Sequence, residues 1–202
     1  MKKLTLLLTV AMMAIATTAS AQFTNGKAGA ADTENYNRAW VSYSPVEIEN
    51  MDLTGISAGW TKGLSIMSDA PLFLETGVNI MYGFGSQDEI DSSYLGVNIP
   101  ALITYKFAVS EKAVIAPYAG VNIRGNILGK SEYDGYYSEE IKWFDDAEDG
   151  GLDAKRVCFG ASVGVNFELN KFSIGVGYTT DFTKFAVDAK VKYFSIAVGM
   201  KF

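Results

Sequence analysis

Histidine is absent from this 202-residue chain, and its absence limits the chemistry that the other residues can perform. Such a chain has no Ser-His-Asp triad, no imidazole acid or base, and no histidine ligand for zinc or haem. Carboxylate chemistry remains open. The single cysteine, Cys158, excludes an intramolecular disulfide, and we interpret it as a small buried apolar residue. We therefore predict no catalytic site and no cofactor.

Seven charged residues fall on the small-residue side of segments whose side chains alternate between two faces: Glu75, Lys106, Arg124, Arg156, Glu168, Asp181 and Lys201. The spacing predicts Glu75 opposite Lys106, and Glu168 level with Lys201. One interpretation is a selectivity ring or a proton path. The other is a structural plug of ion pairs, because charges removed from bulk water must be paired.

The segment 129–154 combines acidic residues with five aromatic residues: Tyr133, Tyr136, Tyr137, Trp143 and Phe144. Its run Asp145–Asp153 could bind Ca²⁺ or bridge divalent cations to lipopolysaccharide phosphates, or it is a solvated loop. The run does not match the spacing of an EF-hand, and we predict no metal site. We expect the aromatic residues to pack on one another or to contact a partner.

These side chains must be positioned by strands, because most of the chain after residue 36 has a period of two. Near the C-terminus, Phe194, Ile196, Val198, Met200 and Phe202 alternate with small or polar residues. The first strand is the weakest, because Pro45 removes a hydrogen-bond donor. The pattern predicts eight strands: Asn37–Val46, Asp52–Ile66, Leu72–Phe84, Ser93–Val109, Ala113–Leu128, Lys155–Leu169, Lys171–Phe182 and Lys190–Phe202.

The connections alternate in length, which is typical of an outer-membrane barrel with short periplasmic turns and longer extracellular loops. We expect short turns at 67–71, 110–112 and 170, and long loops at 85–92, 129–154 and 183–189. The break at 47–51 is a short exception. Since the polar face is mostly Gly, Ser, Asn and Thr, we place it inside and the bulky face against lipid. The predicted fold is an all-β, eight-stranded, antiparallel, transmembrane up-and-down β-barrel.

The N-terminus predicts export. Lys2 and Lys3 precede an apolar core, and Ala19-Ser20-Ala21 forms a cleavage site. We therefore expect a signal peptide over 1–21, a flexible lead-in over 22–36 and the barrel over 37–202, with the C-terminus in the periplasm. The net charge is −6 and argues against a nucleic-acid partner.

The signal peptide, the eight strands, the segment 93–107 and the glycine-alternating hairpin 160–178 resemble the small outer-membrane β-barrel family of Bacteroidetes. That family includes relatives of PorT, and its architecture is similar to OmpX and the OmpA barrel. The resemblance implies insertion by the barrel-assembly machinery, which reads a terminal aromatic strand. It implies no catalytic residues.

We predict a non-enzymatic protein of the Gram-negative outer membrane, with a membrane-structural or adhesion-like surface role through its outer loops. Its expected partners are outer-membrane lipid, lipopolysaccharide and an unidentified surface partner. Two alternatives remain: a small passive channel, which needs a water-filled lumen, and a lipid-modifying barrel enzyme, which the absence of histidine disfavours.

Overall fold

The computed structural model describes residues 33–48, 51–87, 89–133, 139–146, 148, 151–186 and 189–202. The predicted signal peptide and most of the predicted lead-in lie outside these residues. No helix within the described ranges is long and apolar enough to cross a membrane. The described ranges contain ten strands: β1 (Tyr36–Ile48), β2 (Met51–Ser65), β3 (Leu72–Gln87), β4 (Ile90–Tyr105), β5 (Phe107–Ala108), β6 (Ala113–Tyr133), β7 (Glu139–Lys142), β8 (Val157–Leu169), β9 (Phe172–Asp181) and β10 (Val191–Lys201).

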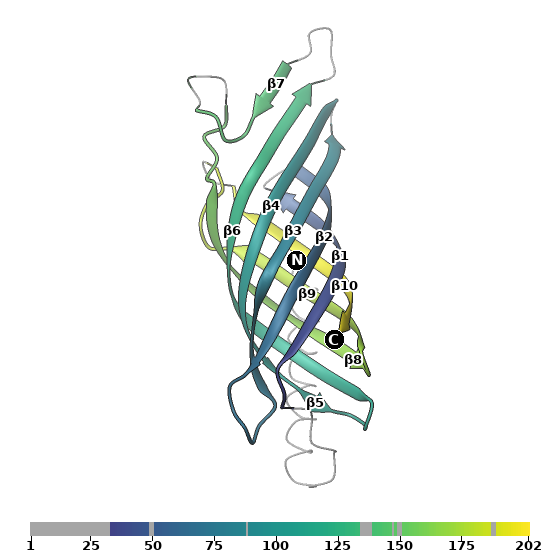
Figure 1. Ribbon diagram of the computed structural model, residues 1–202. Coiled ribbons are helices and arrows are strands. Elements are labelled where there is room, and N and C mark those ends of the chain that lie inside the picture. The colour runs from purple at the N-terminus through teal and green to yellow at the C-terminus, as the bar shows by residue number, and fades with distance from the viewer. Residues whose placement is uncertain are drawn as a thin grey trace, which may run out of the picture.

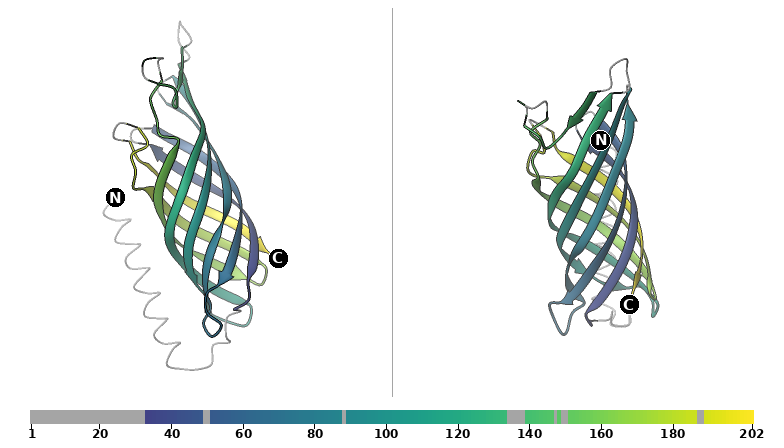
Figure 2. Two further views of the ribbon diagram at one scale, coloured as in Figure 1. Left: turned by 60° about the vertical axis from the view of Figure 1, so that its left-hand side comes forward. Right: turned by 45° about the horizontal axis from the view of Figure 1, so that its top comes forward.

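The strands form a closed antiparallel barrel. Each long strand pairs with its neighbours in the chain, β1 pairs with β10, and β4 also pairs with β6. The short strand β5 follows β4 after Lys106 and pairs with β6, and β7 adds to the far end of β6. Eight strands therefore make the wall, as predicted, and both further views show it closed (Figure 2).

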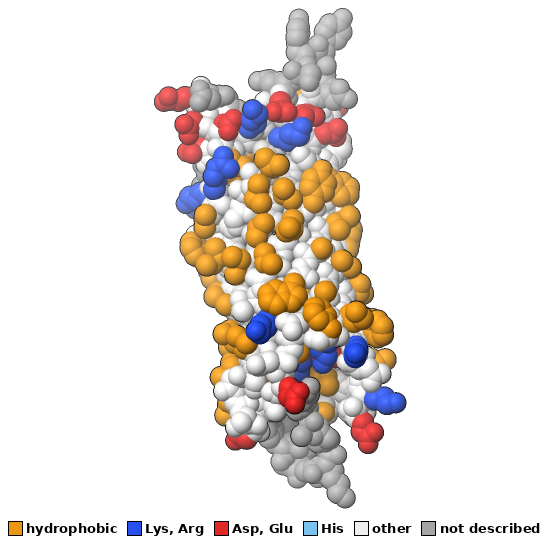
Figure 3. Space-filling model, in the orientation of Figure 1, with side chains coloured by type: hydrophobic (Ala, Val, Ile, Leu, Met, Phe, Trp, Pro, Cys, Tyr) orange, Lys and Arg blue, Asp and Glu red, His pale blue; other side chains and the backbone are white. Residues whose placement is uncertain are grey.

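The wall has the apolar surface outside. Large apolar side chains such as Ile56, Ile99, Phe159, Ile174 and Ile196 are about half exposed, while the alternate positions face inward. On the face that Figure 3 shows, hydrophobic side chains form a band across the barrel, with charged side chains gathered at its two ends. A soluble barrel has the opposite arrangement, with its apolar face inside.

Three strands, β3, β4 and β6, extend further than the sequence pattern predicts, all at the same end of the barrel. The expected loop at 85–92 is wrong, because β3 and β4 stay paired until Gln87 meets Ile90. The strand β6 continues to Tyr133 and pairs with β7, so part of the expected loop at 129–154 is also sheet. Beyond the apolar band neither face of the sheet contacts lipid or a core, so neither needs apolar side chains. The alternation of apolar and polar residues therefore ends there, although the backbone hydrogen bonds between the strands continue. As a result β3, β4, β6 and β7 project past the barrel wall (Figure 1).

Pro45 is accommodated without ending β1. The pairing of β1 with β10 runs through Tyr43 and Ile196, omits the next two positions, and resumes at Val46 and Tyr193. The side chain of Pro45 is exposed, and the residue still pairs with Thr54 on the other side. The missing N–H therefore costs one local interruption of the ladder.

Candidate functional site

The barrel interior holds the polar and charged side chains, in three levels. The lowest level lies near the turns at 66–71 and 109–112, and we call it the lower charge cluster. Its members share a buried or half-buried position on the inner face: Tyr36, Arg38, Glu75, Lys106, Glu168 and Lys201.

Two carboxylates organise the lower charge cluster. Glu75 accepts hydrogen bonds from the hydroxyl of Tyr36 and from Arg38, whose Nη2 lies 2.7 Å from Oε2. Oε2 of Glu168 lies 2.8 Å from Lys201 Nζ and 3.3 Å from Lys106 Nζ. The Arg38 Nη1 atom lies 3.7 Å from Glu168 Oε1 and links the two groups. Three cations thus share two carboxylates whose side chains are 1% exposed.

An aromatic wall supports these charges. The Lys106 ammonium lies 3.5 Å from the centre of the Tyr36 ring, and Phe73 packs edge-on against the same ring. Glycine at position 63 makes room for that ring, since a Cβ there would lie 2.2 Å from Tyr36. A desolvated cation gains more from an aromatic face than an exposed one does.

The pairing differs from the sequence prediction in one respect. Glu75 lies opposite Leu102 rather than Lys106, because the register that pairs Phe84 with Ser93 places Glu75 four residues short of Lys106. Its ionic partner is Arg38, which sequence reasoning missed together with Tyr36. Arg38 lies on β1, the strand that alternation marks least clearly. Tyr36, expected in the flexible lead-in over 22–36, is instead the first residue of β1.

The upper level contains a second buried pair, Arg124 and Asp181. The Nε atom of Arg124 donates to Asn126 Oδ1 at 3.1 Å, and the Tyr94 hydroxyl donates to the same oxygen at 2.5 Å. The predicted inward residue Arg156 does not join this pair. It is exposed, 5.2 Å from the Phe144 ring, because β8 begins only at Val157 and the strand alternation does not reach it.

Between the two charged levels lies a polar cavity of about 100 Å³. Its wall is made mainly of hydroxyl and amide side chains, with Arg38 and Glu75 among them, and it includes Ser57, Thr61, Asn79, Asn98, Tyr118 and Asn166. A cavity of this size has room for several water molecules, since each needs roughly 10–15 Å³.

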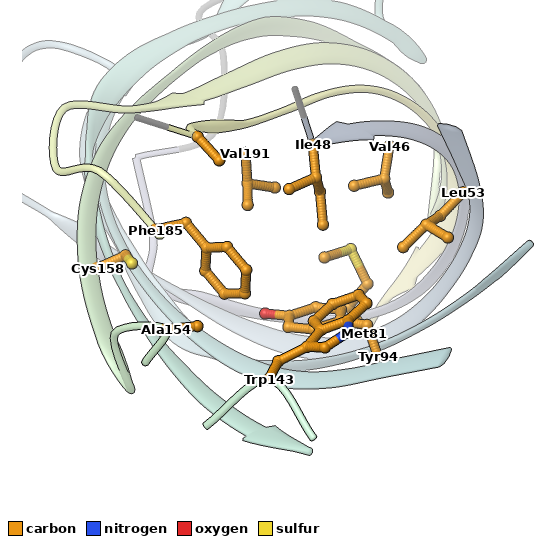
Figure 4. Packing of buried hydrophobic residues seen from close by; sticks show 11 residues of the cluster. Val46, Ile48, Leu53, Met81, Tyr94, Trp143, Ala154, Cys158, Phe185 and Val191 are labelled. Carbon is orange, nitrogen blue, oxygen red and sulfur yellow. The ribbon is translucent and has the colours of Figure 1, made fainter. Parts of the chain in front are cut away.

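An apolar cap closes the other end of the barrel (Figure 4). Trp143 is 1% exposed, its indole N–H donates to Ser131 Oγ at 2.9 Å, and its ring meets Phe185 edge-on. The glycine at 129 accommodates the indole, because a Cβ there would lie 2.4 Å from it. The cap consists of buried residues from strands and connections: Val46, Ile48, Leu53, Met81, Tyr94, Trp143, Ala154, Cys158, Phe185, Ala189 and Val191.

The aromatic residues that were predicted to pack together or to contact a partner do not share one environment. Trp143 lies inside the apolar cap and Phe144 packs against it, whereas Tyr133 is 44% exposed on the projecting sheet. Tyr136 and Tyr137 lie outside the described residues. Among the residues that the structure describes, no His, Cys, Asp and Glu side chains gather as a metal site, and part of the acidic run, 147 and 149–150, is not described.

Comparison with known proteins supports the architecture. No protein-family model matches the chain, and no curated protein matches it in sequence. The outer-membrane enzyme PagL is 12% identical over 81% of this chain and 98% of its own, with a TM-score of 0.50. The fold is that of a small outer-membrane β-barrel. Neisserial surface protein A is 14% identical over 83% and 97% of the two chains (TM-score 0.48), and Ail of Yersinia pestis 14% over 85% and 100% (TM-score 0.45).

In this barrel, buried side chains occupy both ends of the lumen. The lower charge cluster fills one end and the apolar cap fills the other. Eight strands enclose an interior that side chains just fill, so this closure follows from the strand number. The arrangement buries paired charges in the lumen, and the projecting sheet extends an accessible polar surface beyond one end of the barrel.

Proposed function

We propose that this protein is a non-enzymatic barrel of the Gram-negative outer membrane that presents a projecting sheet for surface contacts. Export by a signal peptide, insertion by the barrel-assembly machinery and a periplasmic C-terminus belong to this proposal, as does membership of the PorT-like barrels of Bacteroidetes. The exposed apolar band supports the membrane location, since lipid is the solvent in which such a surface is stable.

The observation that carries the surface role is the contrast between the filled lumen and the extended sheet. The lower charge cluster and the apolar cap bury their side chains, whereas β3, β4, β6 and β7 continue past the apolar band. Strands that leave the membrane carry exposed polar side chains such as Ser86, Asp91 and Glu140. This sheet is therefore the part of the described structure best placed for a surface partner.

Shortening the projecting hairpin tests the proposal. Replacing residues 86–91 by Asn-Gly joins Gly85 to Ser92 through a two-residue turn that suits a β-hairpin. The barrel is expected to insert as before, because the removed pairs lie beyond the apolar band. Cells producing the shortened protein are expected to behave like cells that lack the protein, both in attachment to surfaces and in growth competition with wild-type cells.

The control restores the wild-type chain in the same deletion strain. Wild-type phenotypes in cells with the shortened, fully inserted protein would contradict a role for the hairpin. The passive channel remains the second candidate because of the polar central cavity. Stable conductance steps from the intact protein in a planar bilayer would favour that channel instead.

A further inference from the structure

The polar central cavity borders the lower charge cluster, and Arg38 and Glu75 belong to both. The other side chains in its wall are mainly hydroxyls and amides, which can donate hydrogen bonds to an occupant. Its volume of about 100 Å³ exceeds the space that one water molecule needs. The cavity therefore has room for one small ion together with water.

The charges around this cavity do not balance. The lower charge cluster contains three cations and two carboxylates. The upper pair of Arg124 and Asp181 adds one charge of each sign. The described side chains of the lumen therefore carry an excess of one positive charge, and a buried charge is costly unless it is paired. A monovalent anion in the cavity would balance this excess.

Arg38 is the cation that lines the cavity. Its side chain is 7% exposed, and its Nη2 atom donates to Glu75 at 2.7 Å. Its Nη1 atom has no hydrogen-bond partner among the described residues, since Glu168 Oε1 is 3.7 Å away and beyond hydrogen-bond range. Both oxygens of Glu75 already accept hydrogen bonds, one from Tyr36 and one from Arg38. Arg38 therefore has N–H groups left to donate to an occupant of the cavity.

A second donor lies beside Arg38 in the wall of the cavity. Thr61 is directly opposite Arg38 in the pairing of β1 with β2, and residues placed in this way share a face of the sheet. The buried Thr61 hydroxyl accepts a hydrogen bond from the Trp40 indole at 3.0 Å, so its own proton is available to donate. A guanidinium and a hydroxyl on neighbouring strands thus offer donors to the same space.

We propose that the central cavity binds one chloride ion, held by Arg38 Nη1 and the Thr61 hydroxyl. The single negative charge of chloride matches the excess of one positive charge in the lumen, which a divalent anion would exceed. Water fills the remaining volume and donates to Asn98 Oδ1, a buried atom of the cavity wall without a hydrogen-bond partner among the described residues. The site lies in the lumen, so the inference goes beyond the proposed surface role and does not depend on the projecting sheet.

The chloride dependence of unfolding tests the site in solution. The full-length mature protein is refolded in vesicles of choline phospholipid and unfolded with urea, while chloride is exchanged for gluconate at constant ionic strength. An ion that binds only the folded protein stabilises that state by mass action. We therefore expect the unfolding equilibrium constant to fall about tenfold for each tenfold rise in chloride above its dissociation constant. Equal unfolding constants at every chloride concentration would overturn the proposal.

Two matched variants on β10 separate the site from a general effect of salt. Lys201→Gln removes the excess positive charge, and it is expected to fold because the Lys201 side chain is 19% exposed and Glu168 keeps Lys106 as a partner. We expect unfolding of this variant to lose its chloride dependence. Lys192→Gln removes a cation that is 38% exposed and is expected to keep the wild-type dependence. The same dependence in both variants would contradict the site.

Crystals of the wild-type protein grown in bromide locate the ion, because anomalous scattering distinguishes bromide from water. We expect one bromide peak in the central cavity, in contact with Arg38 and Thr61. Thr61→Val keeps the shape of the side chain without its hydroxyl, and it is expected to shift the chloride dependence of unfolding at least about tenfold to higher concentration. A cavity that contains only water would overturn the proposal. So would a bromide peak in a protein whose unfolding does not respond to chloride, since that result means binding at crystal concentration only.

Discussion

Replacing Glu168 with glutamine is expected to lower the free energy of unfolding by about 3–5 kcal/mol, because it breaks a buried ionic network. Glu168 pairs with Arg38, Lys106 and Lys201, and its side chain is 1% exposed. In the native cluster three cations face two carboxylates. After the substitution Glu75 alone faces all three cations in a poorly solvated site. Urea unfolding in lipid vesicles, followed by tryptophan fluorescence, measures the change.

Two further variants separate charge imbalance from lost packing. Adding Lys106→Met to Glu168→Gln restores the native excess of one positive charge and is expected to recover part of the loss. The exposed pair of Glu47 and Lys192 supplies the control, since Glu47→Gln removes a carboxylate that is 52% exposed. Exposed pairs contribute at most about 1 kcal/mol. A Glu168→Gln loss no larger than the Glu47→Gln loss would show that the lower charge cluster is not a structural plug.

Replacing Ile196 with arginine is expected to cost about 2–4 kcal/mol in a lipid bilayer, because the guanidinium would face hydrocarbon near the midplane. Ile196 is the middle residue of β10, and its side chain is 49% exposed on the outer face. The same substitution at Met200, close to the end of the strand, is expected to cost only about 0–1 kcal/mol. The comparison uses urea unfolding of both variants in the same vesicles.

The difference in cost between Ile196→Arg and Met200→Arg distinguishes a wall that faces lipid from one that faces water. A water-exposed wall would tolerate arginine equally at Ile196 and Met200, because surface substitutions change stability by less than about 0.5 kcal/mol. Equal, small costs at both positions would therefore contradict a lipid-facing wall. A soluble barrel with this surface would also expose a contiguous apolar patch far larger than soluble monomers carry.

Alternation along single strands was sufficient to predict the wall. The period of two in the segments containing Val163 and Ile196 assigned a face to each residue. The observed exposure alternates accordingly around Ile196 and at both ends of β8, whereas residues 161–165 are uniformly half-buried. The same alternation placed Glu75, Lys106 and Glu168 on the inner face, where the structure buries them. Which of them meet depends on register between strands. The long side chain of Arg38 on β1 contacts both Glu75 and Glu168 across the lumen, and alternation along single strands does not predict such contacts.

The ends of the strands were not predictable by the same means. Beyond the apolar band β6 continues through Lys130 and Glu132, where apolar and polar residues do not alternate. The sequence of this part of β6 therefore predicts a loop. Trp143 also has no local signal for its inward position. It enters the lumen because Gly129 leaves space and Ser131 accepts its N–H, two partners brought close by the pairing of β6 with β7.

The most direct test of the account measures which solvent touches the outer wall. Single spin labels are placed at Val163→Cys and at Ile196→Cys in a Cys158→Ser background, and the protein is reconstituted in lipid vesicles. A label at Glu140→Cys on the projecting sheet serves as the water-exposed reference. We expect collisions with dissolved oxygen to dominate at Val163 and Ile196, and collisions with a water-soluble nickel complex to dominate at Glu140. If the labels at Val163 and Ile196 report the nickel complex as the reference does, the wall faces water and the account is wrong.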